Sequence, residues 1–156
     1  MALVVMLANG AGIPTGVAAQ TAPPSTGSAG NTPPQSRKTV WEGVFSEEQA
    51  KRGEALYMKS CTQCHRNDLS GTTSDGPPLK GLDFFIRWRG QTIAEMLDAI
   101  REIMPANNPG ALAPQTYVDI ISFLFKSNGV PIGDTDLRAD PDTLQQILVT
   151  EKAPQG

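Results

Sequence analysis

The sequence predicts an all-α fold, and two observations support that prediction. Apolar side chains recur at helical spacing behind recognisable helix starts, and no stretch alternates between apolar and polar residues as a half-buried strand would. We therefore expect no significant sheet. Four helices can be placed, three in the core of one domain and a short one near the C-terminus.

The first two helices begin at predicted capping boxes. Ser46 with Gln49 three positions later starts a helix that runs to about Lys59. Thr92 begins the second helix in the same way, with a glutamate three positions on, and an apolar stripe continues it to about Met104. Both starts satisfy N–H groups that would otherwise lack partners.

The other two helices carry proline in their first turn, where its missing N–H costs nothing. Pro114 opens a helix that stops at Gly129, and Pro141 opens a short one through Leu148. Residues 67–84 are rich in Gly, Pro, Ser and Thr, so we expect a loop there.

The chain divides into four predicted parts. Residues 1–19 are apolar and uncharged and resemble an export signal cut before Gln20, with a disordered or buried apolar N-terminus as the alternative. This segment is too broken for a membrane span of about 20 apolar residues, so no transmembrane anchor is expected. A disordered Pro/Ser/Thr linker covers 20–39, a folded domain 40–133, and an acidic extension with the short helix 134–156.

The charge pattern limits the partners. Lys and Arg number 13 against 16 Asp and Glu, so there is no basic excess for binding nucleic acid. Residues 37–126 carry eleven charges of each sign, whereas the extension is acidic. Two alternatives remain for the extension: a solvated tail, or a segment whose last helix packs on the domain or docks a partner.

Residues 61–65 read Cys-Thr-Gln-Cys-His and contain the chain's two cysteines and single histidine. Cys-x-x-Cys-His is the signature of covalent haem c attachment. Thiols one helical turn apart project to the same side, where Cys61 and Cys64 can add to the two haem vinyl groups. His65 follows at once and is the predicted proximal iron ligand.

Three other interpretations of the motif are weaker. A thioredoxin-like redox pair is expected to follow a strand in an alternating βα pattern, and this sequence shows neither. A structural zinc site needs four Cys or His ligands, and this chain has three such residues. A plain disulfide leaves the adjacent histidine unexplained.

Because the chain has only one histidine, ligation of the iron by two histidines is excluded, and methionine is the natural candidate for the second axial ligand. Met58 lies just before the motif, on the proximal side. Met96 lies on an apolar stripe, where it is better explained as core filler. Met104 ends its helix before Pro105, where the chain can turn over the haem, so we predict Met104 as the distal ligand. An open sixth position is the alternative.

From Trp41 to about Gly133 the chain resembles a class I cytochrome c domain. Gly53 and Tyr57 resemble the glycine and aromatic residue of that family's first helix, and residues 119–124 resemble its last core helix, with Phe123 at the aromatic position. The resemblance implies a small cytochrome c fold: three core helices around one covalently attached haem, plus the short C-terminal helix.

The resemblance also implies roles for two further residues. Residues 76–81 resemble the loop whose proline carbonyl accepts the histidine ring N–H, which makes Pro77 the acceptor for His65. Trp88 resembles the family's tryptophan whose indole N–H meets a haem propionate, with a core aromatic as the alternative. The two arginines beside it could neutralise a propionate.

A narrower resemblance comes from residues 104–110, Tyr117, 41–45 and 128–131. They are similar to bacterial cytochrome c domains that stand alone or are fused to pyrroloquinoline-quinone (PQQ)-dependent alcohol dehydrogenases. This implies a periplasmic or secreted monohaem cytochrome. It would transfer one electron between a redox enzyme, such as a quinoprotein dehydrogenase, and a downstream acceptor, such as a terminal oxidase.

We expect such a protein to be a carrier and not an enzyme, because two axial ligands leave no iron position for a substrate. The alternative is a haem enzyme of the peroxidase or small-ligand reductase type. Such an enzyme would need an open sixth position and a polar distal group, and the chain has no second histidine that could act as a general acid or base. An apolar shell should exclude water from the haem; its expected members are Leu79, Leu82, Phe84, Phe85, Ile93, Leu97, Ile100 and Leu124.

Overall fold

The computed structural model describes residues 37–72 and 76–152. The predicted signal peptide, residues 1–19, and nearly all of the predicted linker lie outside this part of the chain. Within it, no helix has the length and apolar character needed to cross a membrane.

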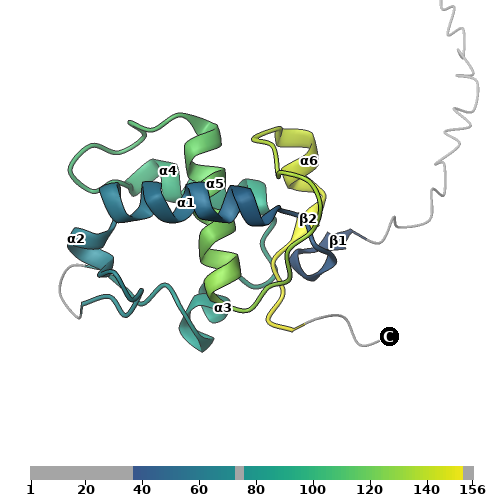
Figure 1. Ribbon diagram of the computed structural model, residues 1–156, viewed down its shortest axis with the longest axis horizontal. Coiled ribbons are helices and arrows are strands. Elements are labelled where there is room, and N and C mark those ends of the chain that lie inside the picture. Colours follow the sequence, from purple (N-terminus) through teal and green to yellow (C-terminus); the bar gives the residue numbers. More distant parts are fainter. Residues whose placement is uncertain (1–36, 73–75, 153–156) are drawn as a thin grey trace, which may run out of the picture. The chain divides into compact units, whose positions relative to one another are not determined.

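Helices dominate the described residues, which confirms the predicted all-α class (Figure 1). Besides a 3₁₀ turn, β1 and β2 are the only other regular elements there, two residues each, paired in parallel. The elements are β1 (Lys38–Thr39), α1 (Glu47–Ser60), α2 (Thr62–His65), α3 (Leu82–Trp88), α4 (Ile93–Ile103), α5 (Pro114–Ser127), α6 (Pro141–Gln145) and β2 (Ile147–Leu148).

The first core helix, α1, crosses α5, and the two helices form the frame of the domain (Figure 1). Tyr57 of α1 and Phe123 of α5 meet with their ring centroids 5.2 Å apart. Below the crossing, α3 packs against α5 through Phe84 and Phe125, whose centroids are 6.1 Å apart. Such aromatic pairs add to the stabilisation from burial alone.

The predicted helix starts are right, but one of the two capping boxes is not formed. At α4 both halves exist: the Thr92 hydroxyl accepts from the Glu95 N–H at 3.2 Å, and the Glu95 carboxylate accepts from the Thr92 N–H at 2.7 Å. At α1 the Ser46 hydroxyl accepts from the Gln49 N–H at 3.0 Å. The Gln49 side chain does not return to Ser46, because it is used in a tertiary network.

Helix α3 corrects the sequence prediction, since residues 67–84 were expected to be loop and α3 begins at Leu82. Its seven residues are too few to show a helical period clearly. Tertiary burial stabilises it, because Phe84, Phe85 and Trp88 all point into the core.

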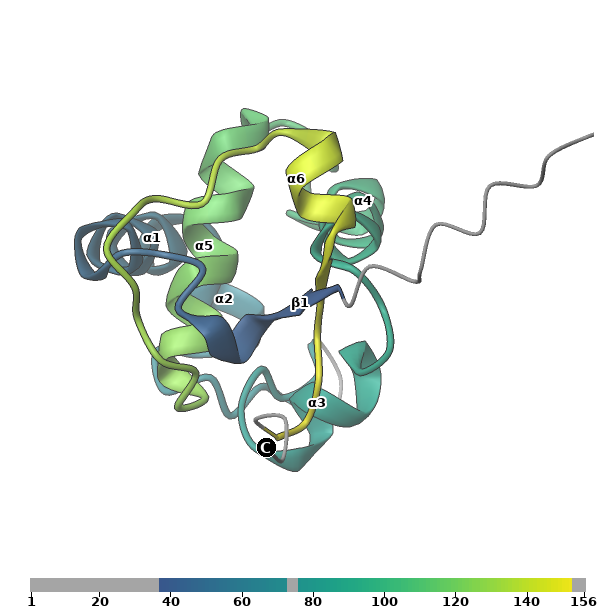
Figure 2. The ribbon, with the colours of Figure 1, turned by 90° about the vertical axis from the view of Figure 1, so that its right-hand side faces the viewer.

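The C-terminal segment packs on the helices, which is one of the two arrangements that the sequence left open. Leu137, Leu144, Ile147 and Val149 are all buried. Figure 2 shows α6 beside α4, with the segment then running past β1 towards α3. Helix α6 ends at Gln145, short of the predicted Leu148, because the chain there turns to pair with β1.

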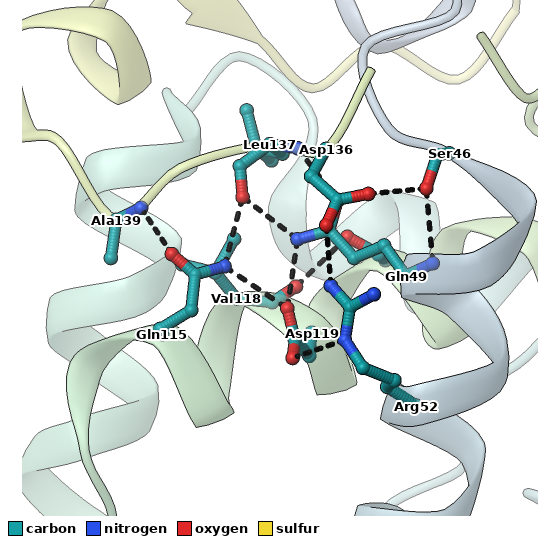
Figure 3. A network of polar contacts seen from close by, with 10 residues as sticks. Ser46, Gln49, Arg52, Gln115, Val118, Asp119, Asp136, Leu137 and Ala139 are labelled. Carbon is teal, nitrogen blue, oxygen red and sulfur yellow. Dashed lines mark hydrogen bonds and ion pairs between the residues drawn. The ribbon is translucent and has the colours of Figure 1, made fainter. Parts of the chain in front are cut away.

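A polar network ties this segment to the α1–α5 crossing (Figure 3). The Gln49 amide donates to Asp119 at 2.9 Å and to the Leu137 carbonyl at 2.7 Å, and it accepts from the Leu137 N–H at 2.6 Å. Arg52 bridges Asp119 at 3.3 Å and Asp136 at 2.6 Å. These bonds satisfy Gln49 and Asp119, which are buried and would otherwise destabilise the fold.

Candidate functional site

A cavity of about 650 Å³ opens between the ends of α1, α3 and α4 and one side of α5. Its size falls within the ~300–1,000 Å³ typical of cofactor and ligand sites. All six predicted site residues line this cavity: Cys61, Cys64, His65, Pro77, Trp88 and Met104.

The Cys-x-x-Cys-His motif folds as one helical turn on the cavity wall. Cys61 ends α1 and begins α2, and the His65 N–H donates to the Cys61 carbonyl at 3.0 Å. Both cysteines are free and face the cavity. Burial, with a smaller contribution from Cys64, raises the pKa of the Cys61 thiol to about 11.

The His65 ring is buried and held in one orientation. Its Nδ1 lies 2.9 Å from the Pro77 carbonyl oxygen. Since a carbonyl can only accept, Nδ1 carries the proton and Nε2 is left as the free nitrogen. A Cβ at Gly76 would come within 3.0 Å of two ring atoms, so glycine is what lets the loop approach the ring this closely.

Met104 is the one methionine of the described residues that lines the cavity. Met96 is fully buried in the core and Met58 is exposed on α1, as expected for residues with no ligand role. The Tyr117 hydroxyl donates to the Met104 carbonyl at 2.7 Å. Sequence reasoning noted Tyr117 only as part of a resemblance and missed this contact, because nothing local links the two positions.

Trp88 is buried at the cavity wall, with the Arg87 guanidinium 5.1 Å from its ring centroid. Arg87 also lines the cavity, which puts a cation beside the indole. Arg89 instead forms an ion pair with Glu151 at 3.3 Å, so the two arginines that flank Trp88 have different surroundings.

The apolar wall differs from the expected shell. Leu82 is 58 % exposed, because α3 turns its other face, with Phe84 and Phe85, into the core. Of the expected shell, Leu79, Ile100 and Leu124 do line the cavity. The expectation was wrong for four others, which are buried in the core without lining the cavity: Phe84, Phe85, Ile93 and Leu97. Further apolar side chains line the cavity that were not expected: Leu112, Ile120 and Ile121.

Together these features define a class of protein: a small all-α domain whose cavity presents a thiol pair, an oriented imidazole and a thioether, the donor set of a c-type haem. Comparison with known proteins agrees. Residues 48–124 match the family described as cytochrome C oxidase, cbb3-type, subunit III. A "Cytochrome c" from Gossypium barbadense is 26 % identical over 99 residues, covering 50 % of this chain and 89 % of that protein.

Residues 48–124 are thus similar to cytochrome c family domains, and the match together with the spacing of Cys61 and Cys64 implies covalently bound haem c, with its iron, as the cofactor. No solved structure matches the chain. The narrower resemblance to domains that accompany PQQ-dependent dehydrogenases finds no support in these comparisons.

Proposed function

We propose that this protein is a monohaem c-type cytochrome that passes single electrons from a redox enzyme to a downstream acceptor. The observation that carries the proposal is that one cavity joins Cys61, Cys64, His65 and Met104. The match to the cytochrome c family supports an electron-carrying haem protein, and the cavity contains a histidine and a methionine that could serve as the two iron ligands.

The proposal assigns a role to each site residue. Cys61 and Cys64 would hold the haem through two thioether bonds, and His65 and Met104 would bind its iron. The Pro77 carbonyl, 2.9 Å from His65 Nδ1, leaves Nε2 free for the iron and would make the imidazole a stronger ligand. Trp88 would donate its indole N–H to a haem propionate, and Arg87 beside it would compensate the propionate charge.

When bound, haem supplies an iron that alternates between the ferrous and ferric states. The residues around it set how easily it does so. A thioether ligand such as Met104 favours the ferrous state, and the apolar wall excludes water and acts in the same direction. With His65 and Met104 both bound to the iron, no position would remain for a substrate on the metal, and the bound haem would exchange electrons with partner proteins.

For its setting, we propose export to the periplasm or beyond, based on the predicted signal at residues 1–19. Candidate partners are a quinoprotein dehydrogenase as donor and a terminal oxidase as acceptor. N-terminal sequencing of the protein secreted by a bacterial host tests the export step: a start at Gln20 is expected, and retention of Met1 in cytoplasmic protein would overturn it.

The site assignment is tested on full-length protein made with haem-attachment machinery. Mass spectrometry should show one added haem that acidified organic solvent does not extract. Met104→Ala should abolish the sulfur-to-iron charge-transfer band of the ferric form, and Met96→Leu, a volume-conserving control in the core, should keep it. Colourless wild-type protein would overturn the proposal. Tight carbon monoxide binding by the ferrous wild type would instead favour the haem enzyme.

A further inference from the structure

Two polar side chains lie at opposite ends of α5, and each contacts one of the two loops that face the haem cavity. We propose that α5 is the element that sets both axial ligands in place, with Tyr117 as a positioning residue for Met104 and Asn128 as a positioning residue for His65. The inference rests on the proposed function, because it assumes that these two side chains bind the iron.

On the distal side, the main chain of Met104 is held from two directions. Its N–H donates to the Ile100 carbonyl at 2.8 Å, which belongs to the last turn of α4. Its carbonyl accepts from the Tyr117 hydroxyl at 2.7 Å and from the Gly110 N–H at 3.2 Å. Tyr117 is only 2 % exposed, so this hydroxyl is largely shielded from bulk water. The Met104 thioether thus projects from a backbone anchored to α5.

On the proximal side, the Asn128 side chain makes three hydrogen bonds, to the loop and to the end of α5. Its amide N–H₂ donates to the Leu79 carbonyl at 3.0 Å and to the Leu124 carbonyl at 2.8 Å. Its oxygen accepts from the Gly81 N–H at 2.7 Å. One side chain therefore caps α5 and pins the loop that follows Pro77.

The pinned loop is the one that orients the histidine. Pro77 lies two residues before Leu79, and its carbonyl is 2.9 Å from His65 Nδ1. The Leu79 N–H donates to the Leu69 carbonyl at 2.9 Å, so Leu79 is fixed on both sides. Removing the Asn128 bonds frees one of those sides and lets the Pro77 carbonyl drift from the ring.

Helix α5 is suited to this task because it is the most deeply buried helix of the described residues, with an unbroken run from Tyr117 to Phe125. Tyr117 and Asn128 are eleven residues apart, about 16 Å along a helix axis. A helix of this kind cannot shorten or lengthen without breaking its own hydrogen bonds, so it holds the two loops at a constant separation.

The proposal requires that a change at each end of α5 affects a different ligand: Tyr117 affects Met104 and Asn128 affects His65. A general loss of stability would not separate the two effects in this way. Tyr117→Phe keeps the ring and removes the hydroxyl. We expect imidazole, used as a competitor for the Met104 position, to bind the ferric protein about 5- to 10-fold more tightly, which matches the loss of one hydrogen bond. Ser122→Ala is the matched control, since it removes a buried hydroxyl that bonds the Val118 carbonyl within α5.

Asn128→Ala should leave imidazole affinity unchanged, raise the reduction potential, and speed hydrogen exchange at His65 Nδ1 in the holoprotein. The potential rises because a weaker bond from Nδ1 lowers the electron donation of the imidazole to the ferric iron. Asn128→Leu has nearly the same size, adds no charge and loses the donor to Leu79, so it tests the same contact if the alanine variant fails to mature. Ser127→Ala, exposed and adjacent, is the control.

Equal imidazole affinities for Tyr117→Phe and Ser122→Ala, or an unchanged potential and exchange rate in both Asn128 variants, would overturn the role of α5. These outcomes differ from failure of the proposed function, which would already show in wild-type protein as missing haem or a missing charge-transfer band.

Discussion

Gly53 of α1 lies directly against the main chain of Asp119 in α5. A Cβ built on Gly53 would come 1.8 Å from the Asp119 carbonyl oxygen, far inside any real contact. The absence of a side chain at this one position lets the two helices cross at close range. The crossing in turn places the motif at the end of α1 opposite the cavity face of α5.

We predict that Gly53→Ala prevents this crossing. Alanine favours a helix by about 1 kcal/mol over glycine, but the clash is with backbone and cannot be relieved by a rotamer change. The expected result is a loss of more than about 3 kcal/mol in unfolding free energy, together with poor haem incorporation. Urea unfolding and haem content per chain measure both. Glu54→Ala, on the exposed side of the same helix, should leave them unchanged, and near-normal stability of Gly53→Ala would show that the helices can separate freely.

Acid should weaken the attachment of the C-terminal segment through Asp136. Hydrogen bonds from Ser46 and then Arg52 hold the pKa of this carboxyl below its usual value. A lowered pKa in the folded state contributes stability above the unfolded value of about 3.9, and that contribution is lost as the pH falls through the folded value. The Asp136 side chain is 43 % exposed, so the effect is limited to roughly 0.5 kcal/mol.

Comparing unfolding free energies at neutral and acidic pH tests this prediction. Asp136→Asn should reduce the stability at neutral pH and make the drop on acidification smaller than in wild type. Asp134→Asn, also exposed in the extension, serves as the control. An identical pH dependence for wild type and Asp136→Asn would mean that the carboxylate contributes nothing to the folded state.

Ending the chain after Gly133 should destabilise the domain strongly, because the removed segment supplies core residues and polar partners. Leu144 and Val149 would be lost from the core, and Gln49 would keep a buried amide without the Leu137 backbone. We expect a loss above about 3 kcal/mol, from apolar burial and unsatisfied polar groups together. A chain ending at Lys152 is the control. The measurement is the thermal unfolding midpoint of the two truncated holoproteins, compared at matched haem content. Equal midpoints would rule out a structural role for the segment.

Tyr57→Phe isolates one hydrogen bond to the residue that follows His65. The Tyr57 hydroxyl donates to the Arg66 carbonyl at 2.7 Å, and Arg66 has a φ of 60° that few side chains adopt. The variant keeps the ring contact with Phe123, so a loss of about 1–2 kcal/mol in unfolding free energy is expected from the stranded carbonyl. Urea unfolding measures it. Tyr57→Leu, which also removes the ring, should cost more, and an equal loss in both would place the whole effect on the hydroxyl.

Much of the site could be predicted from the sequence because its key spacings are local. The four steps from Cys61 to His65 are one helical turn in any fold, and the scarcity of histidine directs attention to methionine. The predicted helix starts at Ser46 and Thr92 also depend only on near neighbours, and the structure places both caps there. The fold class follows from the same local signals.

The rest depends on contacts between distant residues. Gln49 looked like half of a capping box, yet its amide binds Asp119 and Leu137, 70 and 88 positions away. Leu82 looked like part of the haem shell until α3 turned it towards solvent. No local pattern distinguishes these outcomes, since the energy of a buried polar group or an apolar side chain depends on what surrounds it after folding.

The amino-acid sequence alone determined the all-α class and the haem c cofactor, because helical periodicity and the Cys-x-x-Cys-His spacing act within a few residues. Only the tertiary structure decided that Met104 shares a cavity with His65, that α5 contacts both loops beside it, and that the C-terminal segment packs on the helices. The physical reason is that close packing and hydrogen-bond satisfaction are properties of the whole folded chain and cannot be assigned to any segment in isolation.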